Sequence, residues 1–437
     1  MFVGASLGSE SAFLLRPFLS SRKEVRALLI DRETLQPSIA ASVYESALHS
    51  RCASPNTFLK YMRSVGLLFS WARDRGVEID ELLLSGSPLE KIEVQSFAHW
   101  LEERYLNEDG RLGSEAINTF NGHLTIVEGA IAWFVLQYFD AQVEGIPKPI
   151  LVQQTLEYSK NAWRSVRMKR THEDIAPDLE DDEIRSIDTF LRSQALEENP
   201  NPKWVRGFLI WRLAIELGLR IGEILSLRLQ DCPGRGRNSF RIVRIAERKN
   251  QVDPRGIYSP RPKTLSRELA PVLDNTAFPA LVTQYQSMHR VRRVTGPKGR
   301  KMVRPVVTHQ FLIVSDSGAP LAVFTARGIA KAISAETGVK FSWHLARHAF
   351  FNRAYSAVAE LEDPTLRQTR LNDLVYWGGW KDADSLAIYS RRARADRARN
   401  ALAIWGGGAR STSQVCHDLR RGIRLLGRRP WKLFCSQ

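Results

Sequence analysis

The sequence predicts a mainly α-helical protein with a small antiparallel β-sheet, an α+β fold divided into more than one domain. Apolar residues recur at helical spacing over much of residues 54–230 and 326–405. Between residues 240 and 271 the pattern changes to short strands separated by Gly and Pro. The length of 437 residues also exceeds what one hydrophobic core usually serves.

Residues 36–165 are expected to form one helical domain. Ser54 can cap a helix and Pro55 suits its first turn, and Gly76 ends it. Between them, apolar residues follow at spacings of three and four: Phe58, Met62, Val65, Phe69 and Ala72. Residues 90–106 and 114–139 repeat this pattern, whose simplest role is core packing. Residues 1–35 carry too little pattern to be assigned.

Residues 166–179 read as an interdomain linker. Basic residues there lead into a run of acidic ones around Pro177. The acidic residues suit the first turn of a following helix, where free N–H groups favour negative charge. The basic residues near this point are candidate contacts for a polyanion: Arg164, Arg167, Lys169 and Arg170.

Residues 180–405 are expected to form a second domain. Residues 180–230 are helical in pattern, and Phe240 and Ile242 mark a strand that could pair with residues 263–271. Residues 311–316 could form another short strand, after which helices return from Ala326 to about Trp405. Three glycines at 406–408 then begin a basic tail, residues 406–437.

Composition excludes several classes of protein. No apolar run approaches the roughly 20 residues of a membrane span, and no basic segment precedes the short apolar stretch at the N-terminus, so we expect no secretory signal. The four cysteines are scattered, which argues against a disulfide framework or a Cys-rich zinc site: Cys52, Cys232, Cys416 and Cys435. Scattered cysteines of this kind are typical of proteins in a reducing cytoplasm.

Net charge points to a polyanionic partner. Lys and Arg number 63 against 47 Asp and Glu, a net charge of +16. The excess is concentrated in residues 391–437, and in residues 286–305, where no acidic residue occurs. The second stretch contributes three further candidate contacts: Arg292, Arg293 and Arg300. Nucleic acid fits such concentrated charge best; a solvated basic surface is the alternative, and an anionic membrane is less favoured because no long amphipathic basic helix is evident.

The first group of chemically active residues lies in GLRIGEILSLRLQD, residues 218–231. Arg220 and Glu223 are three residues apart, which on a helix places them on one face. An arginine held by a carboxylate is oriented to bind an anionic oxygen. Taken alone, however, this pair is more often a surface ion pair.

The second group is HLARH, residues 344–348. On a helix His344, Arg347 and His348 converge, a set that suits phosphate binding combined with proton transfer. The two histidines have the spacing of a zinc-binding HExxH motif, but the Glu is missing and no carboxylate stands close by. A metal site is therefore disfavoured.

The third group is GGWKDADSLAIYSRR, residues 378–392. Tyr389 follows Trp380 by nine residues on a helix-compatible run. A single tyrosine more often packs than reacts. Combined with two arginines, a histidine and a lysine, however, a tyrosine could hold and split a phosphodiester without metal.

In their order and spacing these groups resemble the motifs of the tyrosine recombinase (phage integrase) family. GLRIGE is similar to its first arginine motif, HLARHAF to its H-x-x-R-H motif, GGW followed by Tyr389 to its last motif, and KTLSRELAP to its β-hairpin lysine segment. The resemblance covers roughly residues 180–400. It implies a catalytic domain of that family, and the preceding helices more loosely resemble its SAM-like core-binding domain.

The resemblance also implies roles for individual residues. Tyr389 would attack the scissile phosphate to give a 3′-phosphotyrosyl enzyme, with Arg220 and Arg347 on the non-bridging oxygens. Lys263 would protonate the leaving 5′-oxygen and His344 would help move the tyrosine proton. Glu223 and His348 would support these groups. No metal, cofactor or ATP is implied.

This chain departs from the family pattern at two places. Trp380 stands where most members have a second histidine; some members have Trp there, and its indole N–H can still donate to a phosphate oxygen. Lys249 also lies in the expected sheet region, so either Lys249 or Lys263 could be the hairpin lysine.

The resemblance further implies the partners. These are double-stranded DNA recombination sites and a homo-tetramer on DNA, alone or with a partner recombinase or accessory factor, exchanging strands through a Holliday junction in the bacterial cytoplasm at the nucleoid. Residues 406–437 would dock on a neighbouring protomer. Two alternatives stay open: a type IB topoisomerase-like enzyme and a catalytically silent DNA-binding protein.

Overall fold

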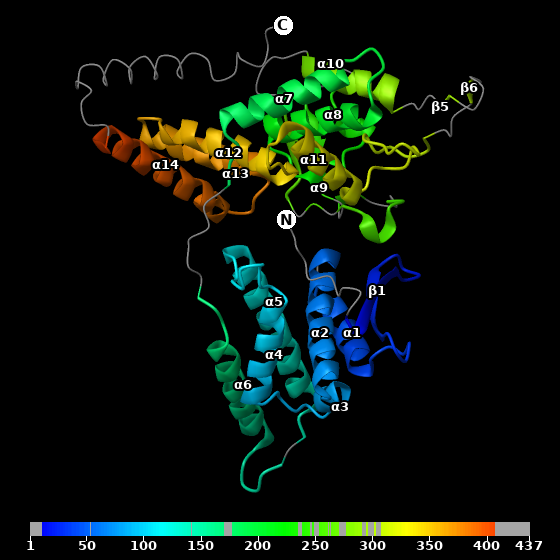
Figure 1. Cartoon of the computed structure of the whole chain (residues 1–437), viewed down its shortest axis with the longest axis vertical. Coiled ribbons are helices and arrows are strands. Elements are labelled where there is room, and N and C mark those ends of the chain that lie inside the picture. Colours follow the sequence, from blue (N-terminus) through cyan, green and yellow to red (C-terminus); the bar gives the residue numbers. More distant parts are fainter. Residues whose placement is uncertain are drawn as a thin grey trace. The chain divides into compact units, whose positions relative to one another are not determined.

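The computed structural model describes residues 11–406 except 53, 141, 170–176, 235–237, 245, 246, 249–252, 261, 263, 271–276, 291–293, 296–300 and 303–306. Backbone contacts divide the chain into two compact units, Met1–Glu173 and Asp174–Gln437, called here the first and the second unit. Both are mainly helical, and the sheets described each consist of two antiparallel strands (Figure 1). The predicted fold class is confirmed.

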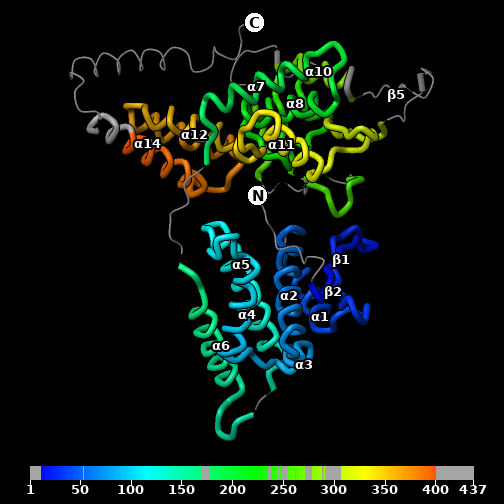
Figure 2. Tube along the Cα trace, viewed as in Figure 1, coloured from blue at the N-terminus to red at the C-terminus, as the bar shows by residue number. Residues whose placement is uncertain are grey.

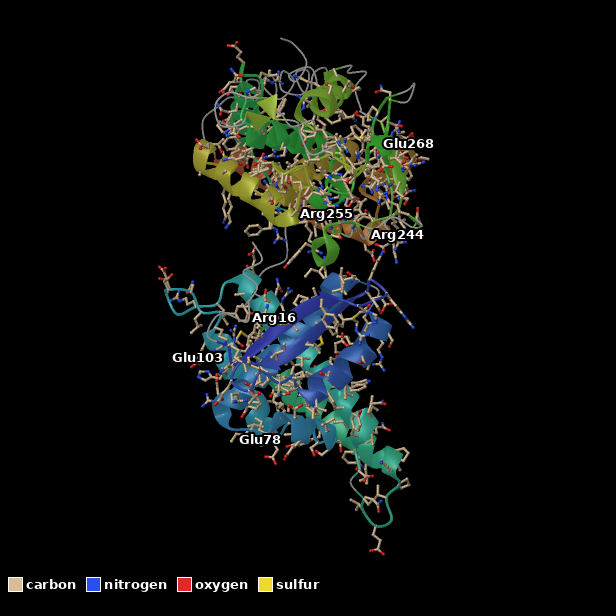
Figure 3. All side chains as sticks on the ribbon, turned by 90° about the vertical axis from the view of Figure 1, so that its right-hand side faces the viewer. Arg16, Glu78, Glu103, Arg244, Arg255 and Glu268 are labelled. Carbon is tan, nitrogen blue, oxygen red and sulfur yellow. The ribbon has the colours of Figure 1, made fainter. Side chains whose placement is uncertain are left out.

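The first unit begins with a hairpin that the sequence left unassigned. Strands β1 (Phe13–Leu19) and β2 (Val25–Asp31) pair in register from Phe13 opposite Asp31 to Leu19 opposite Val25. Alternate residues of β2 are buried against the helices, while Arg16 on β1 is exposed (Figure 3). The period-two alternation of β2 is in its burial and not in its sequence, VRALLID, in which residues 27–30 are all apolar. Residues 13–31 are therefore part of the first unit, although their sequence pattern does not assign them.

Helices make up the rest of the first unit: α1 (Ile39–Arg51), α2 (Pro55–Arg75), α3 (Ile79–Leu84), α4 (Lys91–Glu103), α5 (Ser114–Tyr138) and α6 (Lys148–Ser165). The start of α2 at Pro55 and its end at Gly76, which caps it in the left-handed conformation, agree with the prediction. The predicted apolar stripes of α2 and α5 are buried and these two helices pack together, as Figure 2 shows.

The expected linker does not begin at residue 166. The backbone N–H and C=O of Met168 are both hydrogen-bonded by the side-chain amide of Asn121 on α5. Arg167 forms an ion pair with Glu128 and donates to Thr125, also on α5. Residues 166–169 therefore belong to the first unit, because their polar groups are satisfied there.

The core of the second unit is arranged around one buried helix. Helix α8 (Pro202–Leu217) contacts α7 (Asp181–Ala195), α11 (Val323–Thr337) and α12 (Trp343–Ala359). Most of its side chains are buried, and except for Arg206 and Arg212 the buried ones are apolar, as expected of a helix inside a core. As predicted, α7 starts with acidic residues, at Asp181, Asp182 and Glu183.

The β-structure of the second unit is only partly as expected. Strands β3 (Phe240–Ile242) and β4 (Arg267–Leu269) pair antiparallel, with Phe240 opposite Leu269, which confirms the predicted pairing. Residues 311–316 form no strand: they make single bridges, from Phe311 to Arg228 and from Val314 to Pro320. Shorter elements complete this region: α9 (Ile221–Ile224), η1 (Leu229–Asp231), η3 (Gly256–Tyr258), α10 (Ala277–Gln284), η4 (Tyr285–His289), β5 (Val294–Thr295) and β6 (Lys301–Met302).

Three elements end the described chain: α13 (Pro364–Gly378), η6 (Ala383–Leu386) and α14 (Ala387–Gly406). Both α13 and α14 contact α12 (Figure 1). The return of helices after the sheet region agrees with the prediction. Within the part of the chain that is described, no helix is long and apolar enough to cross a membrane.

Candidate active site

Arg220 does not lie on a helix, in contrast to the expectation. It has an extended backbone and precedes α9 as its N-cap, after a break that Gly218 makes at the end of α8 with a φ of +62°. A side chain at Gly218 would collide with Phe350 and Phe351. The break turns the chain so that Arg220 is half-buried beside α12 and α13.

Glu223 is a fully buried carboxylate that joins three segments of the chain. It accepts hydrogen bonds from the backbone N–H of Arg220 at 2.8 Å, from the Arg267 guanidinium at 2.8 Å and from the Thr264 hydroxyl. Arg347 Nη1 lies 3.8 Å from its Oε2. Burial by itself raises the pKa of Glu223, but the Arg267 charge and hydrogen bond and the Arg347 charge outweigh it, so the pKa lies below its usual range.

Sequence reasoning missed Arg267 and Thr264. The Arg267 side chain is completely buried and donates from Nε to the Trp377 carbonyl oxygen at 2.6 Å. The backbone N–H of Leu265 donates to the Gly379 carbonyl at 3.1 Å, which ties this hairpin segment to the end of α13. A signal existed: Arg267 is two residues from buried Leu269 in a strand, so the two side chains face the same side.

The Gly-Gly-Trp sequence makes a tight turn at the end of α13. Gly379 caps the helix with a φ of +64°, and a Cβ there would lie 2.5 Å from Arg267. A Cβ on Gly378 would collide with the Trp380 ring. The Gly378 carbonyl oxygen accepts from Arg220 Nη1 at 3.3 Å and from Arg347 Nη2 at 3.1 Å. Both predicted phosphate-binding arginines therefore point to one place.

Arg347 is buried, with 1% of its surface exposed. It also donates to the Gly218 carbonyl, and its guanidinium carbon lies 4.6 Å from the Phe351 ring centre and 5.2 Å from that of Trp380. Burial first, and then the charge of Arg220, lower its pKa to about 9. The positive charges of Arg220, Arg267 and Arg347 together exceed the single negative charge of Glu223.

Tyr389 lies against this cationic group. Only 3% of its surface is exposed, and its ring centre lies 5.9 Å from Trp380, 5.6 Å from Phe351 and 5.6 Å from His348. Burial raises the pKa of its phenol, although the charges of Arg347 and Arg220 and a hydrogen bond with Arg347 act in the opposite direction. The phenol is therefore protonated near neutral pH.

His344 and His348 are one turn apart on α12, as predicted, and their Nε2 atoms are 2.9 Å from each other. His344 is exposed and His348 is buried. Burial and then the charges of His344, Arg347 and Arg220 lower the pKa of His348 to about 3. The pKa of His344 is also lowered, because its ring is partly desolvated at the protein surface and faces the charges of Arg347 and Arg220. Within the described residues no third His, Cys, Asp or Glu joins them in a group that could hold a metal ion.

Several predicted residues lie outside the described part of the chain: Lys263, Lys249, Arg170, Arg292, Arg293, Arg300 and residues 407–437. Of the remaining candidate DNA contacts, Arg164 and Lys169 are exposed. Arg167 is engaged with Glu128 and Thr125, so its charge is already used inside the first unit.

No family model matches the sequence, and no curated protein matches it. Solved structures do. The structure is similar to that of the Tn1549 transposon integrase in complex with transposon right end DNA, with a TM-score of 0.49, 17% identity, and coverage of 83% of this chain and 99% of that chain. It is similar to XerH site-specific recombinase bound to palindromic difH substrate in a post-cleavage complex, with a TM-score of 0.46, 14% identity, and coverage of 84% of this chain and 85% of that chain.

A lambda integrase dimer bound to a core site is similar with a TM-score of 0.43 and 14% identity, over 79% of this chain and 94% of that one. The proteins that this chain is similar to are thus integrases and a site-specific recombinase. Each of these three similarities has a TM-score below 0.5.

Proposed function

We propose that this protein is a site-specific DNA recombinase that cleaves and rejoins strands through a phosphodiester bond to Tyr389. The observation that carries the proposal is the convergence of separate sequence motifs on one point. Arg220 and Arg347 donate to the same Gly378 carbonyl, and Trp380 and Tyr389 pack against Arg347. Two guanidinium groups directed at one place form a site for a tetrahedral oxyanion.

The charge balance supports an anionic substrate. Arg220, Arg267 and Arg347 are all largely buried, and Glu223 is the carboxylate that they share. Burying unneutralised positive charge is unfavourable, and a phosphate placed between Arg220 and Arg347 would relieve it. The contacts to the Gly378 carbonyl, at 3.1 and 3.3 Å, are weaker than those a charged phosphate oxygen would form.

The reaction follows from this placement. The Tyr389 oxygen forms a bond to phosphorus while the bond to the 5′-oxygen breaks, and the two arginines stabilise the charge on the non-bridging oxygens. The leaving oxygen takes a proton from a general acid, for which Lys263 is our candidate. Attack by another 5′-hydroxyl reverses these steps and conserves the energy of the bond, so metal and ATP are not needed.

A nicked suicide substrate tests this function. Candidate sites are taken from the DNA that flanks the gene, incubated with protein in excess EDTA, and analysed on denaturing gels for a covalent adduct. Tyr389→Phe should bind DNA and form no adduct. Tyr376→Phe is the matched control, because Tyr376 is 56% exposed and its hydroxyl is hydrogen-bonded to the backbone N–H and C=O of Glu268 on β4.

Three outcomes contradict the proposal: no adduct with the wild-type protein on any flanking sequence, an adduct retained by Tyr389→Phe, or an adduct that needs Mg²⁺. A two-site assay then separates strand exchange in a tetramer, which we propose, from supercoil relaxation by a monomer. The second result would favour the topoisomerase alternative.

A further inference from the structure

The proposed reaction requires a group that takes the phenolic proton of Tyr389. Three rings contact Tyr389: Phe351, Trp380 and His348. Phe has no basic atom, and the indole nitrogen of Trp is only a donor. Arg347, its polar neighbour, is a donor as well. Among these neighbours, His348 therefore supplies the basic atom.

One nitrogen of His348 is unoccupied. Its Nδ1 atom is buried and has no hydrogen-bond partner, and the residue is 5% exposed. Its Nε2 atom contacts Nε2 of His344 at 2.9 Å. Two imidazole nitrogens at this distance share a single proton, so one ring donates and the other accepts.

The unoccupied nitrogen decides which ring donates. If His344 donated, Nδ1 of His348 would carry a buried N–H without an acceptor, an arrangement that is rare because it loses a whole hydrogen bond. If His348 donates, its Nδ1 is a bare lone pair, ready to accept a proton. This second tautomer places an acceptor at Nδ1 and a donor at Nε2.

We infer that His348 accepts the proton of Tyr389 at Nδ1 and passes its own Nε2 proton to His344, so that the two histidines form a relay from the buried nucleophile to the surface. The phenol O–H bond breaks as the O–P bond forms, Nδ1–H forms on His348, and Nε2–H moves to His344. The positive charge ends on His344, which is exposed. Rejoining runs the same steps in reverse. This inference rests on the proposed function.

The surroundings explain why a relay is needed. His344 and Arg347 on α12, Arg220 before α9 and Tyr389 on α14 all face His348. The pKa of His348 is lowered to about 3, first by burial and then by the charges of His344, Arg347 and Arg220, so that His348 does not carry a positive charge near neutral pH. In a relay it never does, because it gains one proton as it loses another. The phenol, whose pKa is raised, still finds an acceptor.

Cleavage rates of His348→Gln and His348→Phe as a function of pH test the relay. Phe keeps a ring against Tyr389 but removes both nitrogens. At pH 7 we expect each variant to lose on the order of 10²-fold in cleavage rate. The loss should shrink by about tenfold per pH unit as hydroxide ionises the phenol directly. A substrate with sulfur at the 5′ leaving position, which needs no general acid, should not rescue either variant.

The matched control is His309→Gln, a partly buried histidine of the same unit that is hydrogen-bonded to the Gly318 carbonyl. It should cleave at the wild-type rate at every pH. Wild-type rates in both His348 variants would overturn the relay, and so would a loss that is equal at all pH values. Both results leave adduct formation by wild type intact; failure of wild type to form any Tyr389 adduct would instead overturn the proposed function.

Discussion

The buried carboxylates of the first unit differ from Glu223 in the second unit in how their charge is balanced. Among the described residues of the first unit, each buried carboxylate pairs with an arginine that reaches solvent: Arg26 opposite Glu45 is 28% exposed, and Arg73 opposite Asp31 is 41% exposed. In the second unit Glu223 faces Arg267 and Arg347, whose side chains are 0% and 2% exposed. Each of these carboxylates in the first unit is neutralised by an arginine, whereas Glu223 faces two buried arginines, so positive charge is in excess around it. Surplus buried charge is what a binding site for an anion requires.

The two units also each contain a buried histidine, and these histidines differ in whether their Nδ1 atom has a hydrogen-bond partner. His123 in the first unit is hydrogen-bonded through Nδ1 to Ser64 and stacks on Tyr105. His348 in the second unit has a similarly lowered pKa but an unpartnered Nδ1. Burial and residue type are alike, so the partner atoms separate a histidine that only packs from one that can react.

The largest stability difference should come from the two carboxylates. Glu223→Gln leaves two buried arginines without their counter-charge and should lower the free energy of unfolding by about 3–5 kcal/mol. Glu45→Gln should lower it by about 1–2 kcal/mol, because water can solvate Arg26. Urea unfolding followed by tryptophan fluorescence measures both. Equal losses would remove the contrast between the units.

The histidines predict a pH effect of intermediate size. Their pKa values, about 4 for His123 and about 3 for His348, lie below the ordinary value of 6.5. Below pH 6.5 the unfolded chain therefore binds protons that the folded chain does not, and stability falls as pH decreases. Each histidine contributes a slope of at most about 1.4 kcal/mol per pH unit.

Unfolding free energies between pH 6.5 and 4.5 should accordingly depend less on pH in His123→Gln and in His348→Gln than in wild type. Both variants should flatten the curve, although His348→Gln alone should impair cleavage. If the dependence of the unfolding free energy on pH were steeper in a variant than in wild type, the histidine replaced in that variant would be charged in the folded wild-type protein.

The smallest effects concern DNA affinity in the first unit. Arg164 and Lys169 are exposed, so Arg164→Ala and Lys169→Ala should each weaken binding to all sequences alike and reduce the salt slope by about 1. Arg167→Ala should leave the salt slope unchanged, because Glu128 already neutralises this arginine. Titrations at several salt concentrations decide the point, and a reduced slope for Arg167→Ala would show that the internal ion pair opens on DNA.

Local sequence pattern was sufficient for much of the fold. Helix α2 could be delimited from Pro55 and Gly76, and the pairing of Phe240 and Ile242 with the segment after Lys263 followed from alternation. It was insufficient for residues 311–316. The apolar residues there suggested a strand, but the backbone forms only single β-bridges, at Phe311 and Val314. The hairpin at residues 13–31 was missed because its β1 strand is apolar without clear alternation.

The sequence by itself determined five groups of the candidate site, Arg220, His344, Arg347, Trp380 and Tyr389, because they stand in motifs whose order and local spacing are visible in the chain. It did not determine Arg267 and Thr264, which also contact Glu223. Tertiary structure alone decided what those groups contact. Glu223 binds Arg267 and the backbone N–H of Arg220, and the Gly378 carbonyl accepts hydrogen bonds from both predicted phosphate-binding arginines, which lie 158 and 31 residues away in the sequence. Spacing along one helix fixes neighbours only three or four residues away. Contacts between segments depend on how the core packs, and so does the burial of Tyr389, Glu223 and the arginines around them.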